Sequence, residues 1–541
     1  MSRARLAAAV FWAGLLVSIA VAFGPIWLAP TQLALGSPHA EGAAHLFGLW
    51  AGLDGGDLFL RQSELANFPA GMKQDLADPL HALFMAPALI WGLPGATLGW
   101  NLLALCTLVL AGVGGWRLGR QLFPQTPEAA TILGLSLACS PVLQGVALSS
   151  GRTEYWAWAW MALPLSLCLS ALRKPTPPHL ALATVSMLPL AWSGWQALIL
   201  GLLVLGPALL LLSRGLDRRW LLLFGGVGAL ASGALLAHHL SATDPWWISR
   251  LDPAGEVRPP SHLSELLPFT ASHYMGDRLM LPGLALTAAA MVGARWAPRG
   301  WTALALSGLL LMFGPTLALG DTQLPGPTRL VDWLPLLGGV SAWPRLGLMV
   351  ATPLAVLAAW AVHHGVERAG KWVLLLAPVL VAEGALFRPE LPTAWYTHSL
   401  DPALEEALAE APPGPILELP NAPIGLPLEA EALRDHDLLQ TRAHGRPSSR
   451  ISSPDTPAAI AHYGLLQALE EGSHLAQVDC RPDPGPVDAG FSLLLLHRDH
   501  MLPGRAGHVE RILIAQWGPP IAEGPAWALF RLQLGVGDGH C

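Results

Sequence analysis

The sequence predicts an all-α polytopic membrane protein that carries a C-terminal, water-facing α/β domain. Only 13% of its 541 residues are charged, about half the usual share of roughly 25% in soluble proteins, and the mean hydropathy is +0.45. The charges are also uneven: residues 79–213 carry seven charged side chains, whereas 389–541 carry 29, of which 20 are acidic. We therefore expect a membrane domain over 1–388 and a soluble domain over 389–541.

This composition excludes several classes of protein. A chain this apolar is neither a soluble enzyme nor a disordered protein, and five cysteines in 541 residues do not make a disulfide-stapled scaffold. The net charge of -7, with no basic stripe, argues against a nucleic-acid binder. The sequence contains no GxxxxGK[ST] motif, so a nucleotide-powered pump is not expected.

Eleven segments approach the roughly 20 apolar residues that a helix needs to cross a bilayer. They are 6–28, 95–116, 128–147, 154–172, 177–192, 194–213, 220–240, 278–294, 300–319, 346–364 and 371–387. The first follows Arg3 and Arg5, and its apolar stretch is longer than the core of a typical signal peptide. We interpret it as an uncleaved anchor.

The segment 79–93 (PLHALFMAPALIWGL) decides the orientation. It is apolar but short, and Pro94 and Gly95 separate it from the next span. If it lies at the interface as an interfacial or re-entrant helix, the basic loop residues all fall on one side, as the positive-inside rule requires of the cytoplasmic face. We therefore predict a cytoplasmic N-terminus and place the connections 29–78, 241–277 and 320–345, together with the tail, on the outer face.

The tail reads as a small α/β domain outside the cytoplasm. An acidic, helix-like run over 401–410 precedes short apolar runs at 416–419, 492–497 and 512–517, which Pro and Gly separate. Cys480 and Cys541 could pair in an oxidising compartment, and the sequence leaves this open.

Ionisable residues at the outer edge of the membrane are candidates for function, because such groups are costly there. Glu41 and His45 are four residues apart, which on a helix places both on one face, where they could share a metal ion or a proton. The alternative is that Glu41 and His45 are solvated loop residues without a functional role. Asp75 and Asp78 precede the segment 79–93, where helix capping is the alternative role.

Two further candidates lie at the predicted outer ends of later spans. Glu154 stands near Arg152 in the loop SSGRTEYWAWAW, and a simple ion pair with that arginine is its alternative role. Arg345 follows Trp343 and Pro344 at the outer start of the span 346–364.

The order of these features resembles the GT-C glycosyltransferases, specifically the bacterial YfhO-like and mannosyltransferase-like group. The resemblance covers nearly the whole chain. It is carried by SPHAEGAAHLFGLW, FPAG, ADPLHALFMAPALIWGLPG, SSGRTEYWAWAW and SAWPRLGLMVATPLAVLAAW, and in the tail by ILELP, AHGRPSSR and LLLLHRDH.

The resemblance implies a transferase in the bacterial inner membrane that moves a sugar from a polyprenyl-phosphate donor to a glycan, lipid or protein acceptor on the outer face. Glu41 matches the family's first-loop acid, a base or metal ligand, although many members carry Asp there; Glu154 matches a second acid and Arg345 the arginine that meets the donor phosphate. His45, Asp75, Asp78 and Arg152 would bind substrate. A divalent ion, Mg²⁺ or Mn²⁺, could be held by Glu41 and His45.

Two other functions stay open from the sequence. A transporter or flippase for a lipid-linked substrate would be built from repeated halves with broken helices. A non-catalytic membrane scaffold would use its outer domain to bind partners.

Overall fold

The computed structural model describes most of the two predicted regions. The described residues are 2–36, 42–54, 60–63, 72–75, 79–217, 219–242, 261–262, 282–319, 322–330, 337, 340, 343–386, 394–397, 401–420, 440–441, 444–449, 485–501 and 503–533. Cys480 and Cys541, whose pairing the sequence leaves open, lie outside them.

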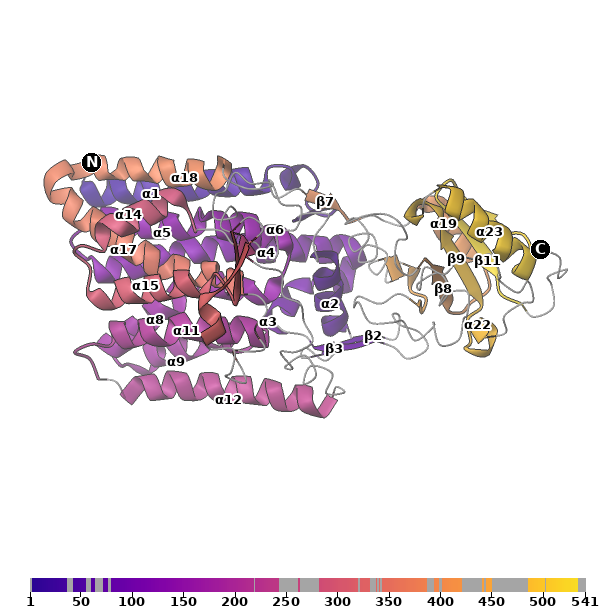
Figure 1. Cartoon of the computed structure of the whole chain (residues 1–541), viewed down its shortest axis with the longest axis horizontal. Coiled ribbons are helices and arrows are strands. Elements are labelled where there is room, and N and C mark those ends of the chain that lie inside the picture. The colour runs from indigo at the N-terminus through magenta and orange to yellow at the C-terminus, as the bar shows by residue number, and fades with distance from the viewer. Residues whose placement is uncertain are drawn as a thin grey trace.

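A bundle of apolar helices forms the larger part of the molecule, and these helices run side by side along its long axis (Figure 1). They are α1 (Arg3–Phe23), α4 (Ala88–Leu122), α5 (Pro127–Ala138), α8 (Ala162–Arg173), α9 (Pro177–Val185), α11 (Trp195–Leu212), α12 (Arg219–Ala242), α14 (Leu284–Gly293), α15 (Arg299–Leu311), α17 (Leu346–Ala369) and α18 (Leu376–Leu386).

Small residues let the central helices approach closely. A Cβ atom added to Gly119 of α4 would lie 2.6 Å from the Cα atom of Ala130 in α5, and one added to Gly134 would lie 2.8 Å from the carbonyl oxygen of Gly112. Interfaces of this kind are typical of helices packed in lipid, where van der Waals contact drives association.

Three helical stretches of the described chain are long and apolar enough to cross a membrane: Arg3–Phe23, Ala88–Leu122 and Trp343–Leu386. A fourth results if Thr153–Ala159 and Ala162–Arg173, bent by 43°, form one broken span. The chain is therefore built as a membrane protein. The predicted eleven spans are not all matched by helices of spanning length, because α9, α14 and α15 are shorter.

The predicted span 300–319 ends early for a clear reason. Helix α15 stops at Leu311, and Thr316–Leu319 forms strand β5, which pairs with β6 (Thr322–Pro325) and β4 (Ser261–His262). Gly314 has φ +67°, and Pro315 has no backbone N–H, so a helix cannot continue through them.

The segment 79–93 folds as short pieces: α3 (Pro79–Ala82), a 3₁₀ turn (Leu83–Met85) and the first turn of α4, which breaks at Gly92, where φ is +59°. The pieces lie close against α4, because a Cβ atom on Gly95 would be 2.2 Å from the carbonyl oxygen of Pro87. Each piece is shorter than the roughly 20 residues that a span requires. That the segment 79–93 lies at the membrane interface stays a prediction.

Contacts between helix ends involve two of the basic residues that are predicted to be cytoplasmic, Arg3 and Arg173. Arg3 Nε lies 2.9 Å from Glu128 Oε1 at the start of α5, and Arg173 donates to the carbonyl oxygen of Gln121. The N-terminus is at one end of the bundle, opposite to the C-terminal part of the chain (Figure 1). That this end faces the cytoplasm stays a prediction.

At the other end of the bundle, two short sheets and a short helix cover the helices. Strand β1 (Leu33–Leu35) pairs with β7 (Ala394–Tyr396), and β2 (Leu60–Ser63) pairs with β3 (Met72–Asp75). Helix α2 (Gly42–Asp54) runs across the bundle axis in Figure 1. Asn101 of α4 holds the segment 30–35, which contains β1, in place. Its amide group donates to the carbonyl oxygens of Pro30 and Leu33 and accepts from the N–H of Leu35.

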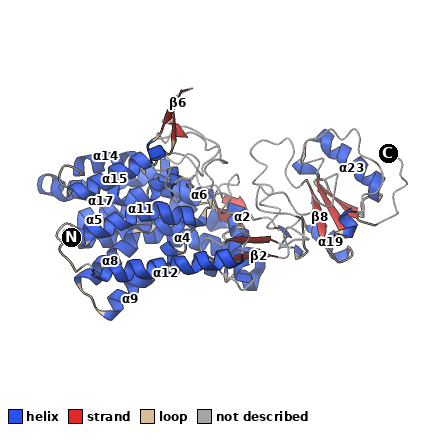
Figure 2. Ribbon diagram, turned by 60° about the horizontal axis from the view of Figure 1, so that its bottom comes forward, coloured by secondary structure: helices blue, strands red, loops and turns tan. Residues whose placement is uncertain are grey.

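The C-terminal unit, meaning here the described residues from 401 to 533, contains a four-stranded sheet, whose strands are drawn in red in Figure 2. Its order is β10 (Ala522–Glu523), β11 (Trp527–Arg531), β9 (Leu493–His497) and β8 (Ile416–Leu419), with β8 and β9 parallel. Side chains of α19 (Pro402–Glu410) pack on one face and those of α23 (Pro503–Trp517) on the other, each around a leucine-rich core. Its predicted outer location is not tested by this arrangement.

Candidate substrate-binding site

Arg345 is buried at the start of α17, where a 3₁₀ turn (Trp343–Arg345) leads into the helix. Its exposed fraction is 7%, and its guanidinium carbon lies 4.8 Å from the ring centre of Tyr155. At this distance the cation is attracted to the electron-rich face of the ring. The tyrosine therefore fixes the arginine from one side.

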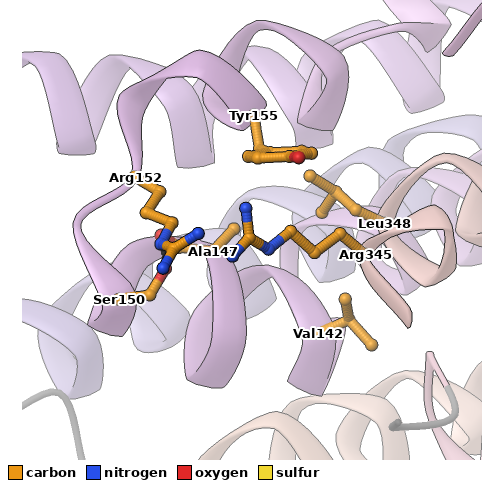
Figure 3. Close-up of a pocket in the computed structure, with 7 residues that line it drawn as sticks. All are labelled: Val142, Ala147, Ser150, Arg152, Tyr155, Arg345 and Leu348. Carbon is orange, nitrogen blue, oxygen red and sulfur yellow. Dashed lines mark hydrogen bonds between the residues drawn. The ribbon is translucent and has the colours of Figure 1, made fainter. Parts of the chain in front are cut away.

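A pocket opens beside this pair, and a second arginine lines it. The lining residues are Val142, Ala147, Ser150, Arg152, Tyr155, Arg345 and Leu348. Figure 3 shows the guanidinium ends of Arg152 and Arg345 pointing toward each other across the pocket. Two guanidinium groups that face one recess can together bind an anion there through charge-assisted hydrogen bonds.

The loop that carries Arg152 depends on a glycine. Gly151 has φ +67°, and a Cβ atom added to it would lie 2.4 Å from the Cα atom of Gly42. The loop is also fixed by Trp156, whose indole N–H donates to the carbonyl oxygen of Ala147 at 2.8 Å. These contacts hold the start of α2 directly against the loop 150–155.

The second pair of polar groups at this end of the bundle is His45 and Glu154. His45 Nδ1 lies 3.5 Å from Glu154 Oε2 and 3.4 Å from the hydroxyl oxygen of Thr153. Glu154 Oε2 is shielded from solvent and makes no hydrogen bond within the described part of the chain. Leaving such an oxygen without a donor costs on the order of 1–3 kcal/mol, which favours a role in binding a proton, a cation or a hydroxyl group.

The structure brings together four of the seven predicted site residues: Arg152 with Arg345 in the pocket, and His45 with Glu154. The two pairs are linked through one 3₁₀ turn (Thr153–Tyr155). In this turn Glu154, which contacts His45, is followed by Tyr155, which contacts Arg345. Asp75 ends β3 opposite Leu60, and its side chain is not described. Glu41 and Asp78 lie outside the described residues, so their predicted roles are untested.

Tyr155 is the residue that sequence reasoning missed. In the sequence it directly precedes the Trp-rich run WAWAW at 156–160, which reads as part of an interfacial aromatic belt. Its position directly after a candidate acid is the signal that could have pointed to it.

The residues present are compatible with a divalent metal ion. An imidazole nitrogen and a carboxylate oxygen 3.5 Å apart, those of His45 and Glu154, can share one ion. This mixed donor pair suits Mn²⁺ or Zn²⁺ better than Mg²⁺, which prefers oxygen ligands throughout.

Comparisons with known proteins give matches in structure alone. No family model matches the chain, and no curated protein matches it. Among solved structures, arabinofuranosyltransferase AftD from mycobacteria matches with a TM-score of 0.52 and 18% identity, over 99% of this chain and 42% of that protein. ArnT from Cupriavidus metallidurans in its apo state matches with a TM-score of 0.50 and 14% identity, over 98% of this chain and 99% of that protein.

The chain shares the helical fold of these two proteins. ArnT has also been solved bound to undecaprenyl phosphate (TM-score 0.46, 11% identity, 99% of both chains). The oligosaccharyltransferase of Archaeoglobus fulgidus, solved with zinc and sulfate, matches with a TM-score of 0.49 and 12% identity, over 93% of this chain and 69% of that protein.

Proposed function

We propose that this protein is a membrane glycosyltransferase that takes a sugar from a polyprenyl-phosphate-linked donor. The observation that carries the proposal is the pocket into which Arg152 and Arg345 both point. Glu154 precedes Tyr155, one of the lining residues, in the same 3₁₀ turn. The shared fold supports it, because ArnT, one of the proteins with this fold, has been solved with undecaprenyl phosphate bound.

The two arginines bind the donor phosphate. Guanidinium groups present planar pairs of N–H donors that match phosphate oxygens, and such charge-assisted hydrogen bonds are about twice as strong as neutral ones. Arg345 is buried and held against Tyr155, so little side-chain freedom is lost when it binds. The phosphate of a lipid carrier lies at headgroup depth, where the end of a spanning helix such as α17 can meet it.

In the transfer step, the oxygen of an acceptor hydroxyl attacks the anomeric carbon of the sugar. The bond between that carbon and the phosphate oxygen breaks, and its electron pair leaves with the phosphate, whose charge the arginines stabilise. The hydroxyl proton passes to a carboxylate. Glu154 is one candidate for this base, and His45 at 3.5 Å can hold a proton beside it.

Glu41 is the second acid of the proposal, as base or metal ligand. Support comes from its neighbour in the sequence, Gly42, which packs against Gly151 in the loop that bears Arg152 and Glu154. A divalent ion held by His45 and the acids would neutralise charge on the leaving phosphate. Asp75 and Asp78 complete the proposed substrate site.

The proposed acceptor is a glycan, lipid or protein at the outer face of the bacterial inner membrane, and the YfhO-like group is the proposed family. The predicted topology supports this side, because it puts α2, the loop 150–155 and the start of α17 at the outer end of the bundle.

The test is donor consumption, which does not depend on knowing the acceptor. Membranes that contain the protein are supplied with a panel of polyprenyl-phosphate-linked sugars, and release of polyprenyl phosphate is measured. We expect release with at least one donor and a loss of 100-fold or more in Glu154→Gln, since general-base catalysis contributes about 10²–10⁴-fold.

The matched control is Glu128→Gln, which changes a buried acid at the opposite end of the bundle and should leave release unchanged. Wild-type release by Glu154→Gln, or no release from any donor, would contradict the proposal.

A further inference from the structure

A second group of polar side chains is buried in the C-terminal unit, away from the proposed transfer site. Glu418, His497 and His500 are each at most 6% exposed. Glu418 lies on β8, His497 ends β9, and His500 closes the 3₁₀ turn that follows (Arg498–His500). Because β8 and β9 are parallel, their carboxyl ends meet at one edge of the sheet and bring these groups together.

The two histidines and an aspartate bring possible metal-ligand atoms close together. One nitrogen of His497, one nitrogen of His500 and one carboxylate oxygen of Asp499 all lie within 4.8 Å of one another. The imidazole rings are parallel, with centres 4.7 Å apart. Both histidines are buried, and Asp499 is exposed, so the group is open to solvent on one side.

Glu418 orients His497. The Nε2 atom of His497 lies 2.9 Å from Glu418 Oε2, which assigns the ring proton to Nε2 and the lone pair to Nδ1. A carboxylate that accepts from the far nitrogen of a histidine is the usual partner of a metal-binding imidazole, because it fixes the tautomer and the ring direction. Glu418 is held in turn by the hydroxyl of Ser448, which donates to Oε1.

The hydrogen-bond order excludes a hydrolase-like triad. In such a triad the imidazole lies between the hydroxyl and the carboxylate, so that it can remove the hydroxyl proton. Here Glu418 lies between Ser448 and His497. The imidazole therefore cannot activate Ser448 and is available to a ligand.

The surrounding structure makes the turn rigid. Arg498, between the two histidine positions, binds Glu510 through two nitrogens and donates to the carbonyl oxygen of Gly524 at 2.6 Å. On the other side of β8, Arg446 donates to carbonyl oxygens at the end of α19, among them that of Pro412. Both arginines are thus engaged in holding the fold.

We propose that His497, Asp499 and His500 bind a divalent transition-metal ion, with Zn²⁺ as the expected occupant and Glu418 as the residue that positions His497. Two imidazoles and a carboxylate are a common zinc ligand set, and three protein ligands leave one coordination position for water or another group. The site is separate from the glycosyl-transfer site and does not depend on it.

Cobalt binding tests the proposal, because tetrahedral Co²⁺ absorbs visible light. The full-length chain without an affinity tag is purified, stripped with a chelator and titrated with Co²⁺, followed by competition with Zn²⁺. We expect one tightly bound Co²⁺ that Zn²⁺ displaces, loss of the signal in His497→Gln and His500→Gln, and 10- to 100-fold weaker binding in Glu418→Gln.

Asp499→Asn guards against a folding artefact, because this exposed side chain can change without disturbing the core; it should weaken Co²⁺ binding and leave unfolding unaltered. His508→Gln, in α23, should bind as wild type. No visible Co²⁺ complex, or one unchanged in His500→Gln and Asp499→Asn, would overturn the proposal, as would a signal lost only in His45→Gln.

Discussion

The guanidinium carbon of Arg345 lies 4.8 Å from the ring centre of Tyr155, although the two residues come from distant parts of the sequence. This contact joins the loop after the π-helical turn Val142–Ala147 to the start of α17. It fixes a positive charge against Tyr155, the residue that follows Glu154 in the same 3₁₀ turn. The proposed function depends on this arrangement.

Replacing the tyrosine ring should loosen Arg345. We expect Tyr155→Leu to raise the KM for the donor about 3- to 30-fold, because a buried cation–π contact contributes roughly 0.5–2 kcal/mol. Tyr155→Phe keeps the ring and should stay within about 3-fold of wild type. Equal KM values for Leu and Phe at this position would show that the ring does not position the arginine.

A methyl group at residue 151 should displace the loop from α2. Gly151→Ala combines a left-handed backbone, which costs roughly 1–2 kcal/mol for other residues, with an approach of 2.4 Å to Gly42. We expect the rate of donor consumption to fall at least 10-fold. Gly233→Ala in α12, where the added atom meets nothing within 4 Å, is the control and should keep full activity. Full activity of Gly151→Ala would mean that this contact does not position the site.

Asn101 should contribute to stability through its three hydrogen bonds to the segment 30–35. Asn101→Leu keeps the size of the side chain but removes all three, and buried hydrogen bonds contribute about 1 kcal/mol each. We expect a loss of about 2–4 kcal/mol, measured as a lower midpoint of denaturant unfolding in detergent. Gln125→Leu, at an exposed position, should change the midpoint little; equal shifts in the two variants would contradict this assignment.

The C-terminal unit should lose stability in mild acid. Burial lowers the pKa of His444 to about 4 from its ordinary value of 6.5, against the opposing effect of Glu418. The unfolded chain therefore binds a proton that the folded chain does not between these values, and stability falls as pH drops from 6.5 to 4. The lowered pKa of His444 contributes up to about 3 kcal/mol to the free energy of unfolding. This contribution is fully present above pH 6.5.

Urea unfolding of the full chain, followed by the ¹⁹F signal of fluorotryptophan at Trp527, measures this dependence. His444→Asn keeps an acceptor for the backbone N–H of Arg446 and should flatten the pH dependence, whereas His508→Asn should not. A wild-type midpoint that does not change between pH 6.5 and 4 would rule out a lowered pKa of His444.

Sequence reasoning predicted the class of fold because long apolar runs and uneven charge report directly on the bilayer. It placed Arg152, Glu154 and Arg345 at one end, because ionisable groups are restricted to the ends of spans. It could not predict that Tyr155 packs on Arg345, since that contact joins segments far apart in the chain. The Pro and Gly breaks that shorten several helices are visible in the sequence, but their effect depends on packing.

The contact between Glu418 and His497 could not be predicted from the sequence for the same reason. ILELP and LLLLHRDH are recognisable as strands from their apolar runs, yet the burial of one carboxylate beside one imidazole follows from the parallel pairing of β8 and β9. That pairing is long-range and leaves no local signal.

The most direct test of the account is the affinity of the purified protein in lipid nanodiscs for undecaprenyl phosphate, with undecaprenol as the uncharged reference. We predict that Arg152→Gln combined with Arg345→Gln weakens phosphate-lipid binding at least 100-fold, since each charged hydrogen bond contributes about 1.5–3 kcal/mol, and leaves binding of undecaprenol unchanged. Equal affinity of wild type and the double variant for undecaprenyl phosphate would contradict the central claim.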